Sequence, residues 1–233
     1  MRMMIAGVMQ SAASRRTSIL FAVLLTWYMG WGLLNASLLG PLQAESVVFF
    51  VVLGVALGRS VGRDDDAARY RHSAEDAAAA WTRDARDGDH YALTFGGEGT
   101  WSQKYNLVWD RLLGLGLFGA DVARSELAHY RAAMQTYGLP LDSRKTYTKL
   151  DWIFWSATLT GSREDFDALA APVYRWLDET PSRVPLTDWY ETTDGRKVGF
   201  QARSVVGGVF IARLADEGVW KKWRGRAAAG LVE

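Results

Sequence analysis

Apolar residues recur every three or four positions in several segments between residues 68 and 214, and this spacing constrains the fold more than any other feature. In one segment Tyr105, Val108, Trp109 and Leu112 keep this spacing, which places them on one face of an α-helix. The same spacing predicts helices in AARYRHSAEDAAAAWTRDARD, ADVARSELAHYRAAMQTYG, KLDWIFWSATLTG and SREDFDALAAPVYRWLDET, and a last helix is expected from about residue 202 to 214. We therefore expect an all-α fold of helical hairpins, joined by short turns and longer polar loops.

Local signals indicate where these elements begin, turn and end. Ser162 is expected to cap a helix, and Pro172 to kink or split it. Asp194 and Gly195 stand between TDWYETT and RKVGF, a turn signal that predicts one small β-hairpin. KLDWIFWSATLTG is apolar nearly all round and ends before Gly161, which is typical of an inner helix of a helical array.

The stretch YGLPLDSRKTYTKLDW, residues 137–152, interrupts this pattern. It follows neither the helical nor the strand period, and it is crowded with charged and hydroxyl side chains. Long loops at one end of a helical array converge on a shared surface. The stretch is therefore interpreted either as a binding rim or as a loop whose charges pair with one another.

The N-terminal part of the chain has a different composition from the rest. Residues 17–44 carry no charge and follow Arg15 and Arg16, and a second apolar run covers residues 46–58. About 20 apolar residues suffice to cross a bilayer, so 17–58 is interpreted as a membrane or signal segment that leaves the main domain outside the cytoplasm. A membrane hairpin and a tract foreign to the domain are the alternatives. The expected divisions are a basic N-terminus (1–16), the hydrophobic segment (17–58), a charged linker (59–67), the helical domain (68–214) and a basic tail (215–233).

Composition removes several classes of function. A net charge of +1 argues against nucleic-acid binding, and the lack of cysteine excludes a thiol nucleophile and thiolate metal sites. FGGEGT, residues 95–100, lacks the Gly-Lys-Ser/Thr ending of a phosphate-binding loop. His72, His90 and His129 are widely spaced and are interpreted as surface or packing residues. No metal and no cofactor are expected.

Three long motifs, in order, carry a resemblance to a known family. They are GTWSQKYNLVWDRLLGLGLF, YGLPLDSRKTYTKLDW and ETPSRVPLTDWYETTDGRKVGFQARSVVGG. Over residues 67–214 the chain resembles the fungal-type glutaminase A family. The resemblance implies an (α/α)6 barrel of the six-hairpin glycosidase-like type, β-rich domains on its N-terminal side, export from the cell, and hydrolysis of glutamine to glutamate and ammonia.

The chain departs from that family in what precedes the matched region. The hydrophobic segment stands where the β-rich domains and the first helices of the barrel are expected. About 150 residues supply roughly three helical hairpins, which leaves apolar inner surface exposed at a cost of about 25 cal/mol per Å². We therefore expect a partial toroid with one small β-hairpin and an N-terminal hydrophobic helix, either truncated or assembled with the missing barrel half or the β-rich domains.

Amide hydrolysis without cysteine needs an acid or base, an oxyanion donor, and groups that hold the amino acid. Asp142 or Asp188 is predicted to be the acid/base carboxylate, and Arg144 and Arg203 to bind the substrate carboxylate or the oxyanion. The remaining predicted substrate-binding residues are the cation Lys145, the amide Gln201, and the pocket walls Trp101, Tyr147 and Trp189.

Other interpretations of the same residues stay open. Asp142 can cap a turn, Asp151 can lie in the first turn of the next helix, and Arg144 can simply pair with either of them.

The predicted function is that of a glutaminase-like amidohydrolase acting on a small amide, or of a truncated part of one. The alternatives are a carbohydrate-active hydrolase of the same barrel class, since two carboxylates suffice for that chemistry, and a non-catalytic membrane-anchored fragment.

Overall fold

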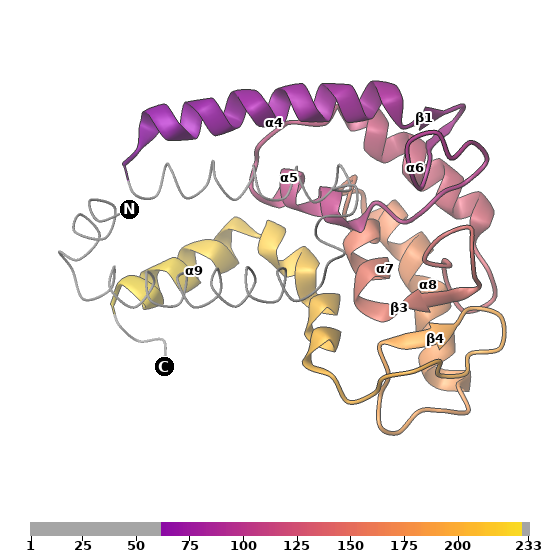
Figure 1. Cartoon of the computed structure of the whole chain (residues 1–233). Coiled ribbons are helices and arrows are strands. Elements are labelled where there is room, and N and C mark those ends of the chain that lie inside the picture. The colour runs from indigo at the N-terminus through magenta and orange to yellow at the C-terminus, as the bar shows by residue number, and fades with distance from the viewer. Residues whose placement is uncertain (1–61, 230–233) are drawn as a thin grey trace, which may run out of the picture. The chain divides into compact units, whose positions relative to one another are not determined.

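The computed structural model describes residues 62–229, in which helices dominate (Figure 1). Arg71–Asp216 form one compact unit, and the described residues on either side of it belong to another. The α-helices are α4 (Asp64–Asp84), α5 (Val108–Leu112), α6 (Ala120–Ala133), α7 (Leu150–Ala157), α8 (Arg163–Glu179) and α9 (Glu217–Ala228). The 3-10 helices are η3 (Tyr105–Leu107) and η4 (Ser204–Ala215), and the strands are β1 (Arg86–Asp87), β2 (His90–Tyr91), β3 (Tyr147–Lys149) and β4 (Trp189–Glu191).

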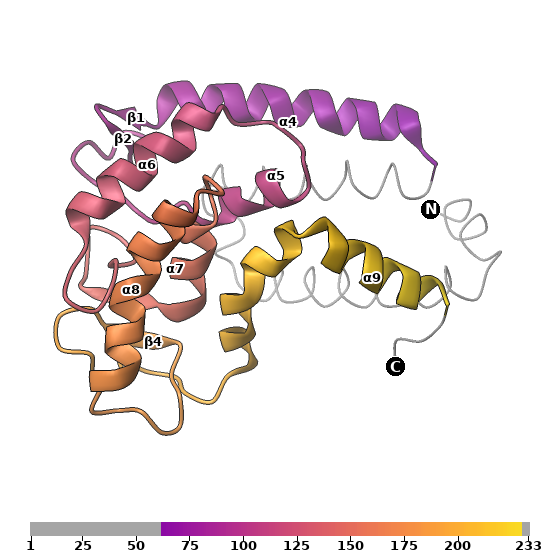
Figure 2. The same cartoon turned by 180° about the vertical axis from the view of Figure 1, so that it is seen from behind.

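Helix α7 lies at the centre of the larger unit. It packs against α8 on one side and against η4 on another, as both views of the chain show (Figures 1 and 2). Ile153 and Ala157 of α7 are buried with Leu169, Val173 and Trp176 of α8. Burying a side chain as large as Ile153, Leu169 or Val173 stabilises a fold by about 1.5–3 kcal/mol. The packing of α7 against α8 therefore forms the core. The prediction of an inner apolar helix in this segment is confirmed.

Two small antiparallel sheets complete the unit, where the sequence predicted one hairpin. β1 pairs with β2, with Arg86 opposite Tyr91, and β3 pairs with β4, with Thr148 opposite Tyr190. The expected turn is present, since Gly195 adopts a positive φ of 73°. The predicted hairpin forms across this turn: Tyr190 makes an antiparallel bridge with Lys197, and the Glu191 N–H donates to the Arg196 carbonyl at 2.8 Å. The pairing of β4 with β3 on its other side was not predicted. β3 lies within the polar stretch that the sequence predicted to be a loop.

Glycine and proline have different effects on the helix boundaries. The helix predicted in residues 100–118 is reduced to η3 and α5, because Gly114 and Gly116 adopt positive φ and end it. Helix α8 is continuous through Pro172, so the predicted split is wrong. Its start is confirmed, since the Ser162 hydroxyl accepts the Asp165 N–H at 3.3 Å. The last predicted helix is present as η4.

The described residues of the second unit are the first turns of α4 and the helix α9. The predicted basic tail is therefore helical in the part described, with Lys221 and Lys222 exposed. Among residues 62–229, no helix combines the length and the apolar character needed to cross a bilayer. The predicted hydrophobic helix in residues 17–58 lies outside the described residues.

Candidate functional site

The first group of predicted site residues gathers around the turn at Asp142. The Asp142 carboxylate accepts the Arg144 backbone N–H at 2.9 Å and its side chain at 3.0 and 2.7 Å. Lys145 is exposed and forms a backbone bridge with Asp142. Trp101 joins the turn through its backbone N–H, which donates to the Ser143 hydroxyl at 3.2 Å. This geometry matches the interpretation of the stretch as a loop whose charges pair with one another.

The second group centres on Asp188, which directly precedes β4 and whose side chain is fully buried. Arg203 Nε donates to Asp188 Oδ1 at 3.0 Å, and Arg203 Nη2 donates to Oδ2. Lys149 Nζ donates to Asp188 Oδ2 at 3.2 Å. One carboxylate therefore holds two cations. The pair with Arg203 uses two of the five guanidinium N–H groups, and the Arg203 side chain is 38% exposed, so it can still meet a ligand.

Aromatic side chains cover this ion cluster. Lys149 Nζ lies 4.2 Å from the centre of the Trp189 ring, and Tyr147 meets the same indole edge-on at 5.3 Å. Phe200 packs against Trp189 at 5.8 Å and lies 4.8 Å from the Arg203 guanidinium. Phe200 was not predicted as a site residue. A cation over an aromatic face is held at about 0.5–2 kcal/mol, so these rings also fix the positions of the two cations.

The segment that carries Arg203 is tightly constrained. Ala202 adopts a positive φ of 55°, which is unusual for a residue with a side chain, and its N–H donates to the Leu186 carbonyl at 2.8 Å. Gln201, a predicted substrate contact, is exposed, and its amide oxygen accepts a hydrogen bond from Lys197 at 2.7 Å. The strained residue next to Arg203 is of the kind that clusters at ligand sites.

Asp151 was set aside by the sequence analysis as a first-turn residue, and it is a member of this cluster. It does lie in the first turn of α7, but it is buried, and its Oδ1 has no hydrogen-bond partner among the described residues. Gly208 of η4 packs so closely that an added Cβ would lie 2.8 Å from the Asp151 Cβ. Glycine at this position therefore lets η4 cover the carboxyl.

The carboxyl groups differ in their protonation. Burial alone would raise the pKa of Asp188, but hydrogen bonds from Arg203 and Lys149 outweigh it and hold the pKa below its usual range. Burial and Arg144 oppose each other at Asp142 in the same way, and its pKa is also lowered. Both groups are therefore ionised at neutral pH and are poor proton donors. Burial and the nearby Asp188 charge raise the pKa of Asp151, which suits a group that exchanges protons.

Lys149 also has an altered pKa. Burial lowers it, and the hydrogen bond and charge of Asp188 counteract part of that effect. Lys149 was not predicted as a site residue. The signal that could have identified Lys149 is its position two residues before Asp151, at the entry to an apolar helix.

The fold and the site define a class: a helical-hairpin domain whose loops gather a buried ion cluster under aromatic rings. Residues 54–213 match the glutaminase A six helical-hairpin domain, and the chain belongs to this family. The resemblance found in the motifs is thereby confirmed.

Two curated relatives show the same relationship. The chain is 34% identical over 162 residues to glutaminase A from Aspergillus oryzae, which covers 66% of this chain and 23% of the relative. It is 33% identical over 207 residues to a protein named "Probable glutaminase" from Arthroderma benhamiae, covering 75% and 23%. The chain thus spans about a quarter of the length of these relatives.

Proposed function

We propose that residues 68–214 are the helical-hairpin part of a glutaminase-type amidohydrolase, and that the ion cluster binds and turns over its amino-acid substrate. The observation that carries the proposal is the buried Asp151 carboxyl, with one oxygen lacking a hydrogen-bond partner among the described residues, beside Asp188 and its two cations. Membership of the glutaminase A family supports glutamine as the substrate. In this proposal the hairpins form part of an (α/α)6 toroid, completed by other domains or by another chain.

Each member of the cluster has a chemical role in the proposal. Asp188 holds Arg203 and Lys149 in place, and their remaining N–H groups bind the substrate α-carboxylate or the developing oxyanion. Asp151 exchanges a proton, because its raised pKa leaves it partly protonated closer to neutral pH than its neighbours. Tyr147 and Trp189 form the walls that exclude water.

The first experiment measures ammonia released from L-glutamine by the 233-residue chain, together with binding of L-glutamate by calorimetry. Asp151→Asn should abolish release and leave binding within about threefold, because the amide keeps the shape of the carboxyl. Asp188→Asn should weaken binding by at least tenfold, since both cations lose their anchor. Asp167→Asn, an exposed carboxylate on α8, is the matched control and should change neither quantity.

Two results would contradict the proposal. One is a chain that does not bind glutamate, because the ion cluster lies wholly within this chain, and the other is an Asp151→Asn variant with unchanged turnover. Hydrolysis of aryl glycosides in place of glutamine would instead support a carbohydrate-active enzyme. Export, with residues 17–58 as anchor or signal, is part of the same proposal. It predicts that a protease added outside intact cells digests the domain of residues 68–214.

A further inference from the structure

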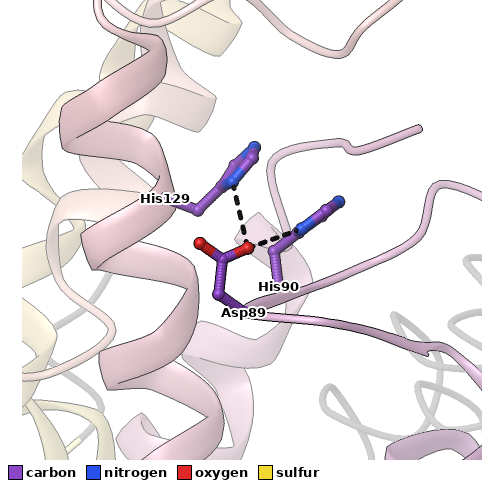
Figure 3. Close-up of side chains that lie close together, drawn as sticks. All are labelled: Asp89, His90 and His129. Carbon is purple, nitrogen blue, oxygen red and sulfur yellow. Dashed lines mark hydrogen bonds and ion pairs between the residues drawn. The ribbon is translucent and has the colours of Figure 1, made fainter. Parts of the chain in front are cut away.

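Two histidines and an aspartate meet at a place that the ion cluster does not use. The rings of His90 and His129 stack with their centres 4.1 Å apart (Figure 3). The Asp89 carboxylate lies beside both: its Oδ1 is 3.1 Å from His90 Nδ1 and 4.0 Å from His129 Nδ1. One donor atom from each of the three residues lies within 4.8 Å of the others. The three donors come together although His90 and His129 are far apart in the chain.

Local structure holds the three donors together. Asp89 lies at the tip of the β1–β2 hairpin beside Gly88, which adopts a positive φ of 62°, and His90 is the first residue of β2. The Ser125 hydroxyl donates to the Asp89 carbonyl, which ties this tip to α6. His129 follows Ser125 by four residues on α6, so it lies on the same face one turn further on.

The hydrogen bonds of His90 select which nitrogen is available to a ligand. Its Nε2 lies 3.2 Å from the Thr100 carbonyl, an acceptor, so a ring that donates there from Nε2 has its Nδ1 available for a ligand. In the neutral ring the lone pair is then on Nδ1, which faces the Asp89 oxygen at 3.1 Å. Two acceptors at that distance repel each other unless a proton or a metal ion lies between them. A histidine that donates to a carbonyl from its far nitrogen is typical of a metal ligand.

Acidic groups lie on both sides of the His90 ring, an arrangement that suits a bound cation. Asp87 Oδ2 lies 3.8 Å from His90 Nε2, and Asp89 Oδ1 lies 3.1 Å from His90 Nδ1.

We propose that Asp89, His90 and His129 bind one Zn²⁺ ion or a similar divalent metal of the first transition row. Zn²⁺ bonds of about 2.0–2.1 Å in a tetrahedron set donor separations of roughly 3.3 Å. The 3.1 Å between Asp89 Oδ1 and His90 Nδ1 matches this value, and the other separations, which reach up to 4.8 Å, shorten when the side chains close on the ion. Imidazole donors suit Zn²⁺ and disfavour Mg²⁺ and Ca²⁺. Three protein ligands leave a fourth position for water. The ion clamps the β1–β2 hairpin onto α6.

Calorimetric titration of ZnCl₂ into the metal-stripped 233-residue chain tests this proposal. One equivalent should bind, and MgCl₂ should not compete. His90→Ala and His129→Ala should each weaken binding at least tenfold. Asp89→Asn, at a side chain 87% exposed and therefore safe for folding, should weaken it about tenfold. At a hundredfold excess over Kd, Zn²⁺ should raise Tm by about 5–10 °C.

The chain supplies its own matched control. It has three histidines and no cysteine, so His72 is the one other imidazole in the sequence. His72 lies exposed on α4, 3.5 Å from Asp76, where it can act as a weak adventitious ligand. His72→Ala should leave the affinity for Zn²⁺ unchanged. Loss of binding in His72→Ala, no saturable binding, or a Tm rise that persists in His129→Ala would each overturn the proposal.

Discussion

Arg203 and Asp188 are joined by two parallel hydrogen bonds. The Asp188 side chain is fully buried, whereas the Arg203 side chain remains partly exposed. Arg203→Lys replaces the two-pronged contact by a single ammonium. We expect the free energy of unfolding to fall by about 1.5 kcal/mol, because a buried carboxylate loses one charge-assisted bond. Affinity for glutamate should fall about tenfold with it. Urea denaturation followed by circular dichroism, and calorimetry, measure the two effects.

The surface pair of Arg163 and Asp167 is the matched control for that substitution. Arg163 Nε also contacts both oxygens of its partner, at 2.8 and 2.7 Å, but the pair is exposed. Arg163→Lys should change the free energy of unfolding by less than about 0.5 kcal/mol. Equal losses at the two sites would show that burial of Asp188 does not matter.

Asp151 gives the fold a pH dependence with a definite sign. Its pKa is raised in the folded chain by burial and by the charge of Asp188. Its contribution to stability is therefore fully present below its unfolded pKa, about 3.9, and is lost as pH rises through the folded value. Asp151→Asn removes this pH-dependent loss of stability, because the amide does not ionise. The unfolding free energy of the variant minus that of the wild type should increase between pH 4 and pH 7. A difference that is flat or decreasing over this range contradicts the argument.

The local elements of the fold could be predicted from the sequence, and the long-range pairings could not. Helices α6 and α8 were predicted because their periodicity and the Ser162 cap depend on neighbouring residues only. The pairing of Thr148 with Tyr190 joins segments that are distant in the chain, whereas the Asp194–Gly195 turn signalled only a local partner. Pro172 was expected to kink or split α8, and the helix runs through it from Arg163 to Glu179.

The candidate site shows the same limit. Asp188 and Arg203 were chosen for their residue types, and the structure brings them into contact. Asp151 was set aside because a first-turn acid has an ordinary explanation in the helix dipole, and its burial under Gly208 depends on a helix more than fifty residues away. An acid inside an otherwise apolar helix was the signal that could have revealed it.

Gly208 should be intolerant of a side chain, although its backbone is not in the left-handed region. A Cβ there would lie 2.8 Å from the Asp151 Cβ and 3.0 Å from the indole nitrogen of Trp155. Gly208→Ala should lower the free energy of unfolding by about 1–3 kcal/mol, because α7 and η4 must separate. Gly207, with nothing within 4 Å of an added Cβ, is the control, and Gly207→Ala should be neutral or slightly stabilising in the same urea titration. Similar losses for both variants would contradict close packing at Gly208.

Gln103 is buried and holds the polar stretch against α7. Its Nε2 donates to the carbonyls of Leu139 and Pro140 at 3.1 and 3.0 Å, and its Oε1 accepts from the Ser156 hydroxyl at 3.1 Å. Gln103→Leu keeps most of the volume but leaves these partners buried without their hydrogen bonds. We expect the free energy of unfolding to fall by about 2–4 kcal/mol, since each unsatisfied buried group costs roughly 1–3 kcal/mol.

The exposed glutamine Gln201 provides the comparison that separates hydrogen bonding from hydrophobicity. Gln201→Leu removes one surface hydrogen bond, from Lys197, and should change the free energy of unfolding by less than about 0.5 kcal/mol.

Amide hydrogen exchange shows which part of the chain loses protection in Gln103→Leu. Because Gln103 contacts the start of the stretch, protection should fall first at Leu141, whose N–H donates to the Tyr147 carbonyl at 2.9 Å. Unchanged protection at Leu141 in a destabilised variant would mean that Gln103 stabilises the core without ordering the stretch.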